Sequence, residues 1–310
     1  MISEFKFSQL IEACRPGETP DWVDLSAPDE RELAYVGERY GLPRWLFTDP
    51  LDPQEWPRVE HDNSMMSIVV RLSVQENTTE GILCRTIPAG IIIFPGLVVT
   101  VCQKAGLVTT HLRRLIQRQR HWTHISLAFA LLHAAGSGYI ENLTRMKELA
   151  GEAEARLRQS PENEELLSLL DIEKSLIDIT TALKSNLALM DKIKQFKSEN
   201  FKLTEDELDL LDDARIENQQ AVFMAEIFGQ VLSSMSEAFG SIISNNLNKT
   251  MKFMAGVTIV LTVPMIISGL FGMNVKLPGT EAGWAFSALC GLALMGMAAV
   301  SILFAKKKWF

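Results

Sequence analysis

Cysteine is scarce in this chain, and the few cysteines it has are widely separated. The 310 residues include four, Cys14, Cys84, Cys102 and Cys290, and no two of them form a C-x-x-C pair. This pattern excludes a disulfide framework and a cysteine-rich zinc site, and it fits isolated reduced thiols in the cytosol. The first residues also lack an unbroken apolar stretch followed by a small-residue cleavage site, so we expect no signal peptide.

A phosphate-binding loop and a basic surface are missing as well. No G-x-x-x-x-G-K-[ST] loop occurs, so we expect no nucleotide cofactor. The chain has 30 basic and 38 acidic residues, and from Met251 onward it has five lysines and one acid, Glu281. The residues before Met251 therefore carry 25 basic and 37 acidic side chains, a net charge of −12. A body this acidic excludes nucleic acid as the main partner, because no basic face neutralises phosphates.

Strand and helix signals alternate in residues 1–120, where we expect an α/β domain. The runs MMSIVVRLSV and GIIIFPGLVVTVCQ are short and rich in β-branched residues, as strands are. A short strand from Trp22 to Leu25 precedes a helix that Pro28 and Asp29 begin and that Gly41 and Pro43 end. This region offers no nucleophile, base or cofactor set, which argues against an enzyme.

Helix signals replace strand signals after residue 121. We expect an antiparallel helical pair over 121–203 and a stalk helix over 204–250, which begins with a capping box of Thr204 and Glu207. No proline occurs from Thr204 until Pro264, so the helix can continue for about 90 Å at ~1.5 Å per residue. Its apolar positions need cover, either from the preceding helices of the same chain or from other copies. The sequence leaves both arrangements open.

Charge is absent from two long stretches near the end of the chain. Residues 253–273 and 284–305 contain no charged side chain, and each stretch meets the length of roughly 20 residues that spans a bilayer. The alternative is a pair of buried core helices. We expect a first transmembrane helix over 251–274, an external loop over 275–283 and a second transmembrane helix over 284–305.

Lysines mark one end of each apolar stretch. Lys249 and Lys252 precede the first stretch, and the second ends in a basic segment at 306–310 with the sequence KKKWF. Basic residues collect on the cytoplasmic side of membrane helices, and aromatic residues collect at the interface. We therefore expect both termini in the cytoplasm and the chain in the cell (inner) membrane.

Small and polar residues form a stripe along the first apolar stretch. Its members follow spacings of 3, 4, 3 and 4, which places them on one helix face: Asn248, Met251, Ala255, Thr258 and Thr262. A hairpin of two helices cannot enclose a pore alone, so conduction along this stripe requires several copies around an axis. Threonines in membrane helices also bond to their own backbone, which is the alternative explanation of the stripe.

The triplet Gly272–Asn274, with the sequence GMN, stands between the two apolar stretches and resembles the motif of the CorA family of magnesium and divalent-cation transporters. The segments WVDLSAPDERELAYVGERYGLPRWLFTDPLD and PRVEHDNSMMSIVVRL are also similar to that family, and the resemblance covers nearly the whole chain. It implies an α+β fold with a cytoplasmic α/β domain and a long stalk helix that continues into the first of two transmembrane helices. It also implies a homopentameric funnel in a lipid bilayer.

The function implied by the resemblance is passive transport of hydrated divalent cations, Mg²⁺ foremost, through a gated pore driven by the membrane potential. Gly272, Met273 and Asn274 would form the selectivity filter. Family members usually carry tyrosine before this motif, whereas this chain has Phe271 and so lacks a hydroxyl there. Transport of Zn²⁺, Co²⁺ or Ni²⁺ by the same architecture is the alternative, and a membrane-tethered enzyme or sensor is a further one.

An acidic patch near the start of the stalk gains a role from the same resemblance. Asn248 matches the family's asparagine near the membrane, and counting back from it places Asp213 at the aspartate that binds regulatory Mg²⁺ between subunits in relatives. Asp209 and Asp212 lie beside Asp213 and would assist it. A solvated helix face is the ordinary explanation of such a patch.

Overall fold

A computed structural model of the chain describes residues 1–7, 11–15, 18–62, 65–78, 81–116, 122–159, 163–195, 203–273 and 283–307. It contains two compact units, Met1–Ser234 and Met235–Phe310, and each unit is described by itself. Helix α6, Glu205–Phe271, is 67 residues long and contributes to both units.

A mixed sheet forms the centre of the first unit. Its strands are β1 (Ile2–Phe7), β2 (Ile11–Ala13), β3 (Trp22–Ser26), β4 (Arg58–Asp62), β5 (Met65–Thr78), β6 (Gly81–Phe94) and β7 (Leu97–Cys102). Their order is β2-β1-β3-β7-β6-β5-β4, in which β3 and β7 are parallel and the other neighbours are antiparallel. The strands predicted from Trp22 and from the two β-branched runs are confirmed.

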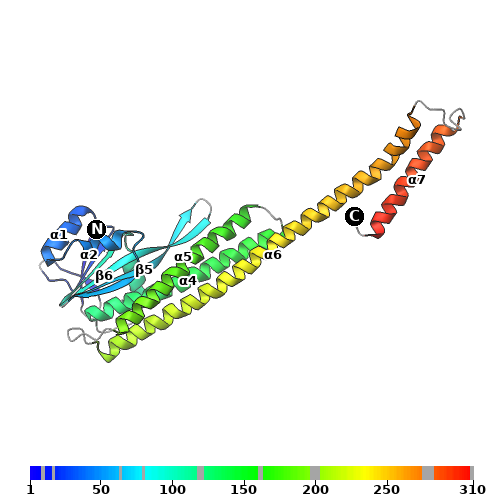
Figure 1. Cartoon of the computed structure of the whole chain (residues 1–310). Coiled ribbons are helices and arrows are strands. Elements are labelled where there is room, and N and C mark those ends of the chain that lie inside the picture. The colour runs from blue at the N-terminus through cyan, green and yellow to red at the C-terminus, as the bar shows by residue number, and fades with distance from the viewer. Residues whose placement is uncertain are drawn as a thin grey trace. The chain divides into compact units, whose positions relative to one another are not determined.

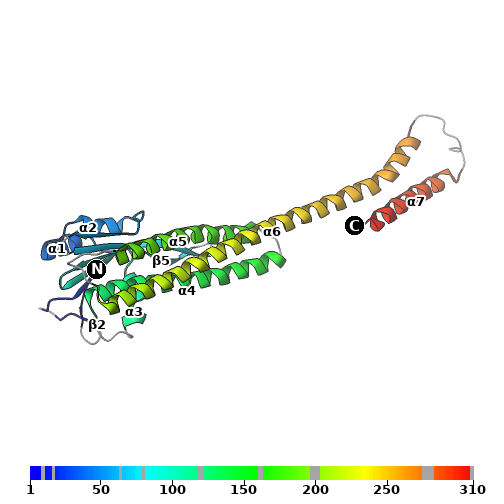
Figure 2. The same ribbon diagram turned by 60° about the horizontal axis from the view of Figure 1, so that its bottom comes forward.

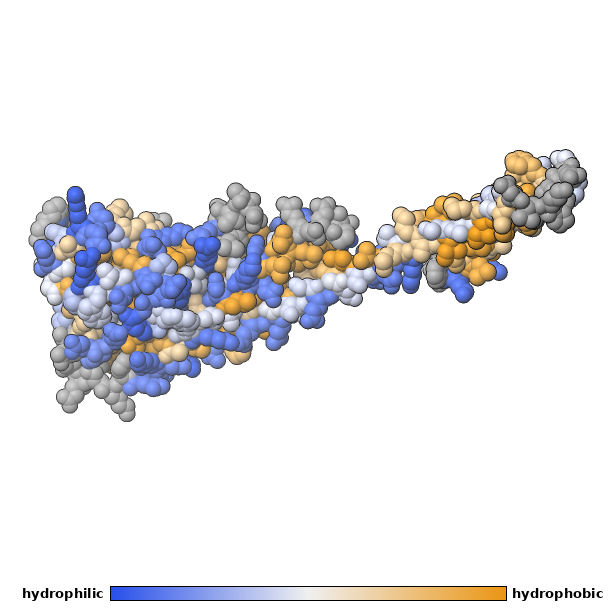
Figure 3. Space-filling view, turned by 45° about the horizontal axis from the view of Figure 1, so that its top comes forward, coloured by the Kyte–Doolittle hydropathy of each residue, from blue (hydrophilic) through white to orange (hydrophobic). Residues whose placement is uncertain are grey.

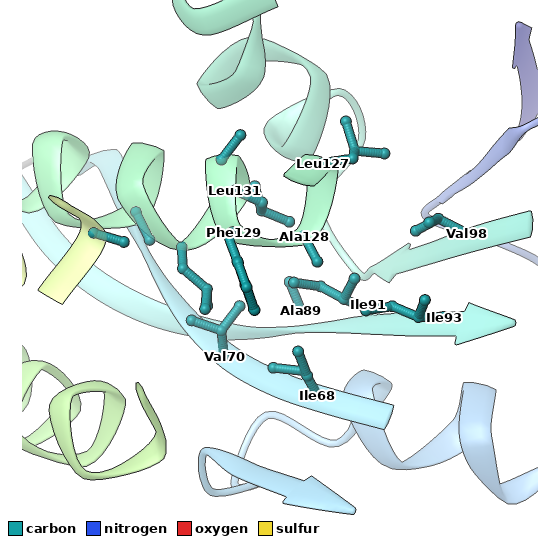
Figure 4. Close-up of a cluster of buried hydrophobic side chains, with 14 of the residues drawn as sticks. Ile68, Val70, Ala89, Ile91, Ile93, Val98, Leu127, Ala128, Phe129 and Leu131 are labelled. Atoms are coloured by element: carbon teal, nitrogen blue, oxygen red, sulfur yellow. The ribbon is translucent and has the colours of Figure 1, made fainter. Parts of the chain in front are cut away.

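Helices cover both faces of this sheet, which explains why its central strands are apolar without alternation. In β6, Ile92 lies in the cluster with α1 (Glu30–Tyr40) and α2 (Trp45–Thr48), whereas Ile91 lies in the cluster with α4 (His124–Gln159). Figure 4 shows the second cluster, where Ala128 and Phe129 of α4 face Val70, Ala89 and Ile91 of the sheet. The core of the unit is therefore a sheet between two helical layers.

The remaining helices complete the layer beneath the sheet. They are α3 (Leu107–Ile116), α5 (Asn163–Gln195) and the first half of α6, and a short 3₁₀ helix, Asp49–Leu51, follows α2. Helices α4, α5 and α6 run side by side in both ribbon views (Figures 1 and 2). The predicted start and end of α1 are confirmed, because the Asp29 side chain caps its first turn and Gly41 ends it in the left-handed conformation.

The predicted capping box at the start of α6 is also present. The backbone N–H of Thr204 donates to Glu207 Oε2 at 3.0 Å, and the Glu207 N–H donates to Thr204 Oγ1 at 3.3 Å. The other oxygen of the Glu207 carboxylate accepts a 2.7 Å hydrogen bond from the hydroxyl of Thr123, just before α4. The same carboxylate therefore begins one helix and ties it to another.

Helix α6 has one covered face and one uncovered face in the first unit. The covered face is buried beside α4 and α5 and contains Leu211, Ala214, Asn218, Ala225 and Leu232. The opposite face exposes large apolar side chains: Ile216, Phe223, Ile227 and Val231. Ile216 and Ile227 are each 61% exposed. The intramolecular bundle therefore accounts for one half of the helix surface, and the other half has no cover within the described part of this chain.

An asparagine closes the open edge of β5. Strand β4 pairs with β5 only as far as Val69, so the next backbone groups need another partner. Asn186 of α5 supplies it: its Oδ1 accepts from the Arg71 N–H at 3.0 Å, and its Nδ2 donates to the Arg71 carbonyl at 2.9 Å. The Tyr139 hydroxyl of α4 donates to the same carbonyl at 3.1 Å. Two helices are thereby joined to one strand residue.

Candidate functional site

The second unit is a helical hairpin made from the end of α6 and from α7, Ala285–Lys306 (Figure 1). Both helices are long and apolar enough to cross a membrane, and only 6% and 0% of their most apolar windows are buried. Figure 3 shows hydrophobic residues gathered over these segments, in contrast to the hydrophilic surface of the first unit. A soluble core helix would be mostly buried, so the exposure favours two membrane spans over the alternative of two core helices.

The two helices meet at a glycine. A Cβ atom added to Gly296 of α7 would lie 2.8 Å from Val263 Cγ1 of α6, closer than real side chains approach. Lys252 stands eleven positions before Val263, and Lys307 stands eleven positions after Gly296. At ~1.5 Å per residue, both lysines lie about 16 Å from the contact, toward the same end of the hairpin. A hydrocarbon layer ~30 Å thick, centred on the contact, therefore ends near them.

The stripe predicted to line a pore lies away from α7. Positions 256 and 260 lie on the same face of α6 as Val263, because they precede it by seven and three residues, and Gly256 is buried. The stripe from Asn248 to Thr262 is rotated from this face by about 130° at 3.6 residues per turn. Asn248, Met251, Ala255 and Thr258 are exposed, and Thr262 is half-buried. The stripe is thus left uncovered by the hairpin itself from Asn248 to Thr258.

Both stripe threonines bond to their own helix, as the alternative explanation of the stripe expects. The Thr258 hydroxyl donates to the Met254 carbonyl at 2.9 Å, and the Thr262 hydroxyl donates to the Thr258 carbonyl at 2.7 Å. The hydroxyl proton is used in each case, but the oxygen keeps a free acceptor lone pair. Water molecules bound to a cation point their protons outward, so such oxygens suit a hydrated cation.

The predicted filter falls only partly within the described residues. Helix α6 ends at Phe271 rather than at residue 274, so the motif follows the helix instead of forming its last turn. The Gly272 N–H still donates to the Ser268 carbonyl at 2.9 Å, and Met273 is exposed. Asn274 and most of the predicted external loop lie outside the described residues.

The acidic patch on α6 is divided by its contacts. Asp212 accepts two hydrogen bonds from Lys194 Nζ of α5, at 2.6 and 2.7 Å, so this carboxylate already has a cation partner. Asp209 and Asp213 stand four residues apart on the exposed face and have no hydrogen-bond or ion-pair partner among the described residues. The same part of the chain contains no group of three or more acidic, histidine or cysteine side chains that could hold a metal alone.

The sequence analysis did not predict that α6 has two apolar faces, one exposed and one covered. Ile227, Val231 and Ile242 are exposed, whereas Leu211, Val222 and Phe239 of the same helix are buried. The sequence does contain the signal. Ile216, Phe223 and Ile227 are separated by seven and four positions, which places them on the helix face opposite to the buried residues. This face starts beside Asp213 and continues toward the hairpin.

Comparison with known proteins gives consistent matches over almost the whole chain. A family model described as "CorA-like Mg2+ transporter protein" matches residues 17–307. The "Cobalt/magnesium transport protein CorA" of Methanocaldococcus jannaschii is 26% identical over 259 residues, which cover 82% of this chain and 79% of that protein. The protein of the same name from Thermotoga maritima is 22% identical over 317 residues, 99% of this chain and 88% of that one.

The fold is likewise similar to a solved structure. "The complete structure of CorA magnesium transporter from Methanocaldococcus jannaschii" superimposes with a TM-score of 0.85 at 22% identity, covering 100% of this chain and 99% of that chain. The expected fold is thereby confirmed: an amino-terminal α/β domain, a long helix and a carboxy-terminal apolar helix.

Proposed function

Because the chain belongs to the family of CorA-like Mg²⁺ transporters, we propose that it carries Mg²⁺ through a pore that several copies build around the α6 stripe. The observation that carries this proposal is the direction of the stripe, which lies on a different face of α6 from the α7 contact and is exposed from Asn248 to Thr258. Packing several hairpins with their stripes inward would give a channel lined by amide, thioether and hydroxyl groups. In that arrangement α7 would face lipid.

The copy number we propose is five, as the family resemblance implies. The exposed apolar face of α6 supports assembly, because Phe223 and Ile227 are 57% and 61% exposed in a single chain. Contiguous apolar surface of this kind marks a protein contact. A ring of α6 helices would bury this face in the cytoplasmic part and bring the stripes together in the membrane.

The membrane potential is the proposed driving force, and the lysines set the proposed orientation. Lys249, Lys252, Lys306 and Lys307 lie at one end of the hairpin and place that end in the cytoplasm by the positive-inside rule. Both termini are then cytoplasmic. An inside-negative potential favours entry of a divalent cation by about 4.6 kcal/mol per 100 mV, so passive influx needs no nucleotide.

The ion would cross with its water shell. Mg²⁺ loses water reluctantly, and residues 253–273 contain no carboxylate that could replace the shell. Hydroxyl oxygens of Thr258 and Thr262 and carboxamide oxygens of Asn274 can accept hydrogen bonds from bound water. Selection would then depend on the size and charge of the hydrated ion, with Gly272, Met273 and Asn274 as the filter.

The test of this function is cation flux into liposomes that contain the purified full-length chain. We expect uptake of Mg²⁺ that follows an imposed inside-negative potential and falls at least tenfold in Asn274→Ala. Asn245→Ala, an exposed asparagine of α6 outside the stripe and the filter, is the matched control and should transport normally. Normal uptake by a correctly assembled Asn274→Ala variant would refute the filter.

Co²⁺ is the second candidate cargo, because both relatives are named as cobalt/magnesium transport proteins. Competition among Mg²⁺, Co²⁺, Ni²⁺ and Zn²⁺ in the same liposomes decides the order. If Zn²⁺ enters while Mg²⁺ neither enters nor competes, the chain is a zinc transporter of the same architecture.

Cytoplasmic Mg²⁺ is the proposed gating ligand, bound between neighbouring copies at Asp213 with help from Asp209. Both carboxylates are exposed and lack partners among the described residues, whereas Asp212 is held by Lys194. Each copy brings a body with a net charge of −12, so copies around an axis repel one another. Bound divalent cations would offset this repulsion and favour a closed ring, and their loss would release it.

Asp213→Asn tests this gate when uptake is followed against internal Mg²⁺. We expect the variant to stay open at internal concentrations that close the wild type. Asp178→Asn, which removes an exposed acid from α5, should leave the closing concentration unchanged. Closure of both variants at the wild-type concentration would remove Asp213 from the gate.

A further inference from the structure

Three lysines lie toward the same end of the α6–α7 hairpin, on the helix faces that continue from the Val263–Gly296 contact. On α6, Lys249 and Lys252 continue the face that touches α7, because the positions 249, 252, 256, 260 and 263 follow spacings of 3, 4, 4 and 3. On α7, Lys307 continues the face that contains Gly296, through positions 300 and 304. The Lys307 N–H donates to the Leu303 carbonyl at 3.1 Å, so Lys307 keeps its helical position.

These lysines bring several positive charges to one end of the hairpin, and no acidic side chain among the described residues there pairs with them. Among the described residues from Ala238 to Lys307 there is no aspartate or glutamate, and no ion pair involves Lys249, Lys252, Lys306 or Lys307. Toward the first unit, the next acid is Glu237, twelve positions or about 18 Å before Lys249. The counter-charge has to come from outside this part of the chain.

The depth of the lysines identifies the source of that charge. Lys252 and Lys307 both lie about 16 Å from the Val263–Gly296 contact, where a bilayer centred on that contact changes from hydrocarbon to phosphate. The stripe lies on a different face of α6 from Lys249 and Lys252, so in the proposed assembly these two lysines would lie outside the pore lining. Lipid phosphates are the anions present at this depth.

We propose that the groove between α6 and α7 ends in a binding site for the phosphodiester headgroup of an anionic phospholipid, formed by Lys249, Lys252 and Lys307. This site rests on the proposed membrane placement and orientation of the hairpin, but not on conduction. A zwitterionic headgroup brings its own ammonium group into the cluster and binds less well. Each lysine contributes about a fivefold preference for the anionic lipid, the usual effect of one basic residue at a membrane surface.

The experiment measures lipid binding to the full-length, delipidated protein by native mass spectrometry, with phosphatidylglycerol and phosphatidylcholine as probes. We expect wild type to prefer phosphatidylglycerol by at least twentyfold. Lys252→Gln combined with Lys307→Gln should reduce the preference to about fivefold, the contribution of the remaining Lys249, and the matching pair of Lys→Arg substitutions should keep the wild-type value. The control pair, Lys147→Gln with Lys192→Gln, changes exposed lysines of α4 and α5 and should keep it as well.

Equal binding of the two lipids by wild type overturns the proposal, and so does an unchanged preference in the Lys252→Gln, Lys307→Gln protein. Displacement of the lipid by millimolar glycerol phosphate assigns the site to free phosphate and also overturns it. Binding is read without flux, so a protein that prefers phosphatidylglycerol but carries no Mg²⁺ contradicts the transport function alone. Correct folding of each variant is checked by the mass of the assembled oligomer in detergent.

Discussion

Two threonine hydroxyls bond to the helix and, in the proposed pore, would also accept hydrogen bonds from a hydrated ion. In Thr258 and Thr262 the proton goes to a backbone carbonyl and the lone pair stays available. This division fixes the rotamer of the side chain, so the acceptor is already oriented when a hydrated cation arrives. A valine has the same shape but no acceptor.

Thr258→Val should therefore reduce Mg²⁺ flux several-fold, whereas Thr258→Ser should retain most of it. Thr250 offers a matched control, because its hydroxyl bonds to the Asn246 carbonyl at 3.1 Å in the same way but lies outside the stripe. Liposome uptake with equal protein loading is the measurement. An equal loss of flux in Thr250→Val would mean that threonine stabilises the helix and does not face the ion.

Asn186 gives a prediction for stability. Replacement by leucine removes both amide contacts with Arg71; the carbonyl keeps the Tyr139 hydroxyl, but the N–H is left without a partner. A buried donor without a partner costs about 1–3 kcal/mol. We expect a lower midpoint of thermal unfolding for the full chain in detergent. Ser185→Ala, at the adjacent position, is the control, and equal midpoints for the two variants would contradict the role of Asn186.

At the scale of elements, the contact between α6 and α7 depends on one missing side chain. Gly296→Ile would place its Cβ 2.8 Å from Val263 Cγ1, so the helices must separate, whereas an added Cβ at Gly291 meets nothing within 4 Å. We expect Gly296→Ile to lower the yield of assembled protein and its flux, and Gly291→Ile to do neither. Adding Val263→Ala should restore part of the loss. If Val263→Ala does not restore yield or flux, and Gly291→Ile also lowers them, then Gly296 is needed for a reason other than its contact with Val263.

The elements also show how far sequence reasoning reached. The limits of α1 and the capping box of α6 were predictable because Asp29, Gly41, Thr204 and Glu207 act on residues within one turn. The partnership of Asn186 with Arg71 was not, because 115 positions separate them and no local rule relates a helix amide to a strand edge. The stripe could be found by spacing, because its residues belong to one helix. The ion pair that Asp212 forms with Lys194 could not be predicted, because the two residues belong to different helices.

For the whole molecule, we expect the uncovered face of α6 to form the contacts between copies in the proposed ring. Ile227→Asp would place a charge on an apolar contact between copies, where it has no partner, so the oligomer should dissociate. Native mass spectrometry should find five times the 34.6 kDa chain for wild type and smaller species for the variant. Thr144→Asp, on the exposed side of α4, should leave the assembly intact. A wild-type mass of two chains would contradict the ring.

The position of the Val263–Gly296 contact also gives the hairpin a response to membrane thickness. In a bilayer centred on this contact, the lysines of α6 and α7 lie at one level, so sliding one helix past the other would move a lysine away from that level. We expect the two helices to tilt together instead, at a cost of fractions of a kcal/mol per Å of mismatch. Tilting α6 would change the radius at which Thr258 and Thr262 face the axis of the proposed pore. The acyl chain length of the surrounding lipid would then act as a second control on flux, independent of any ion.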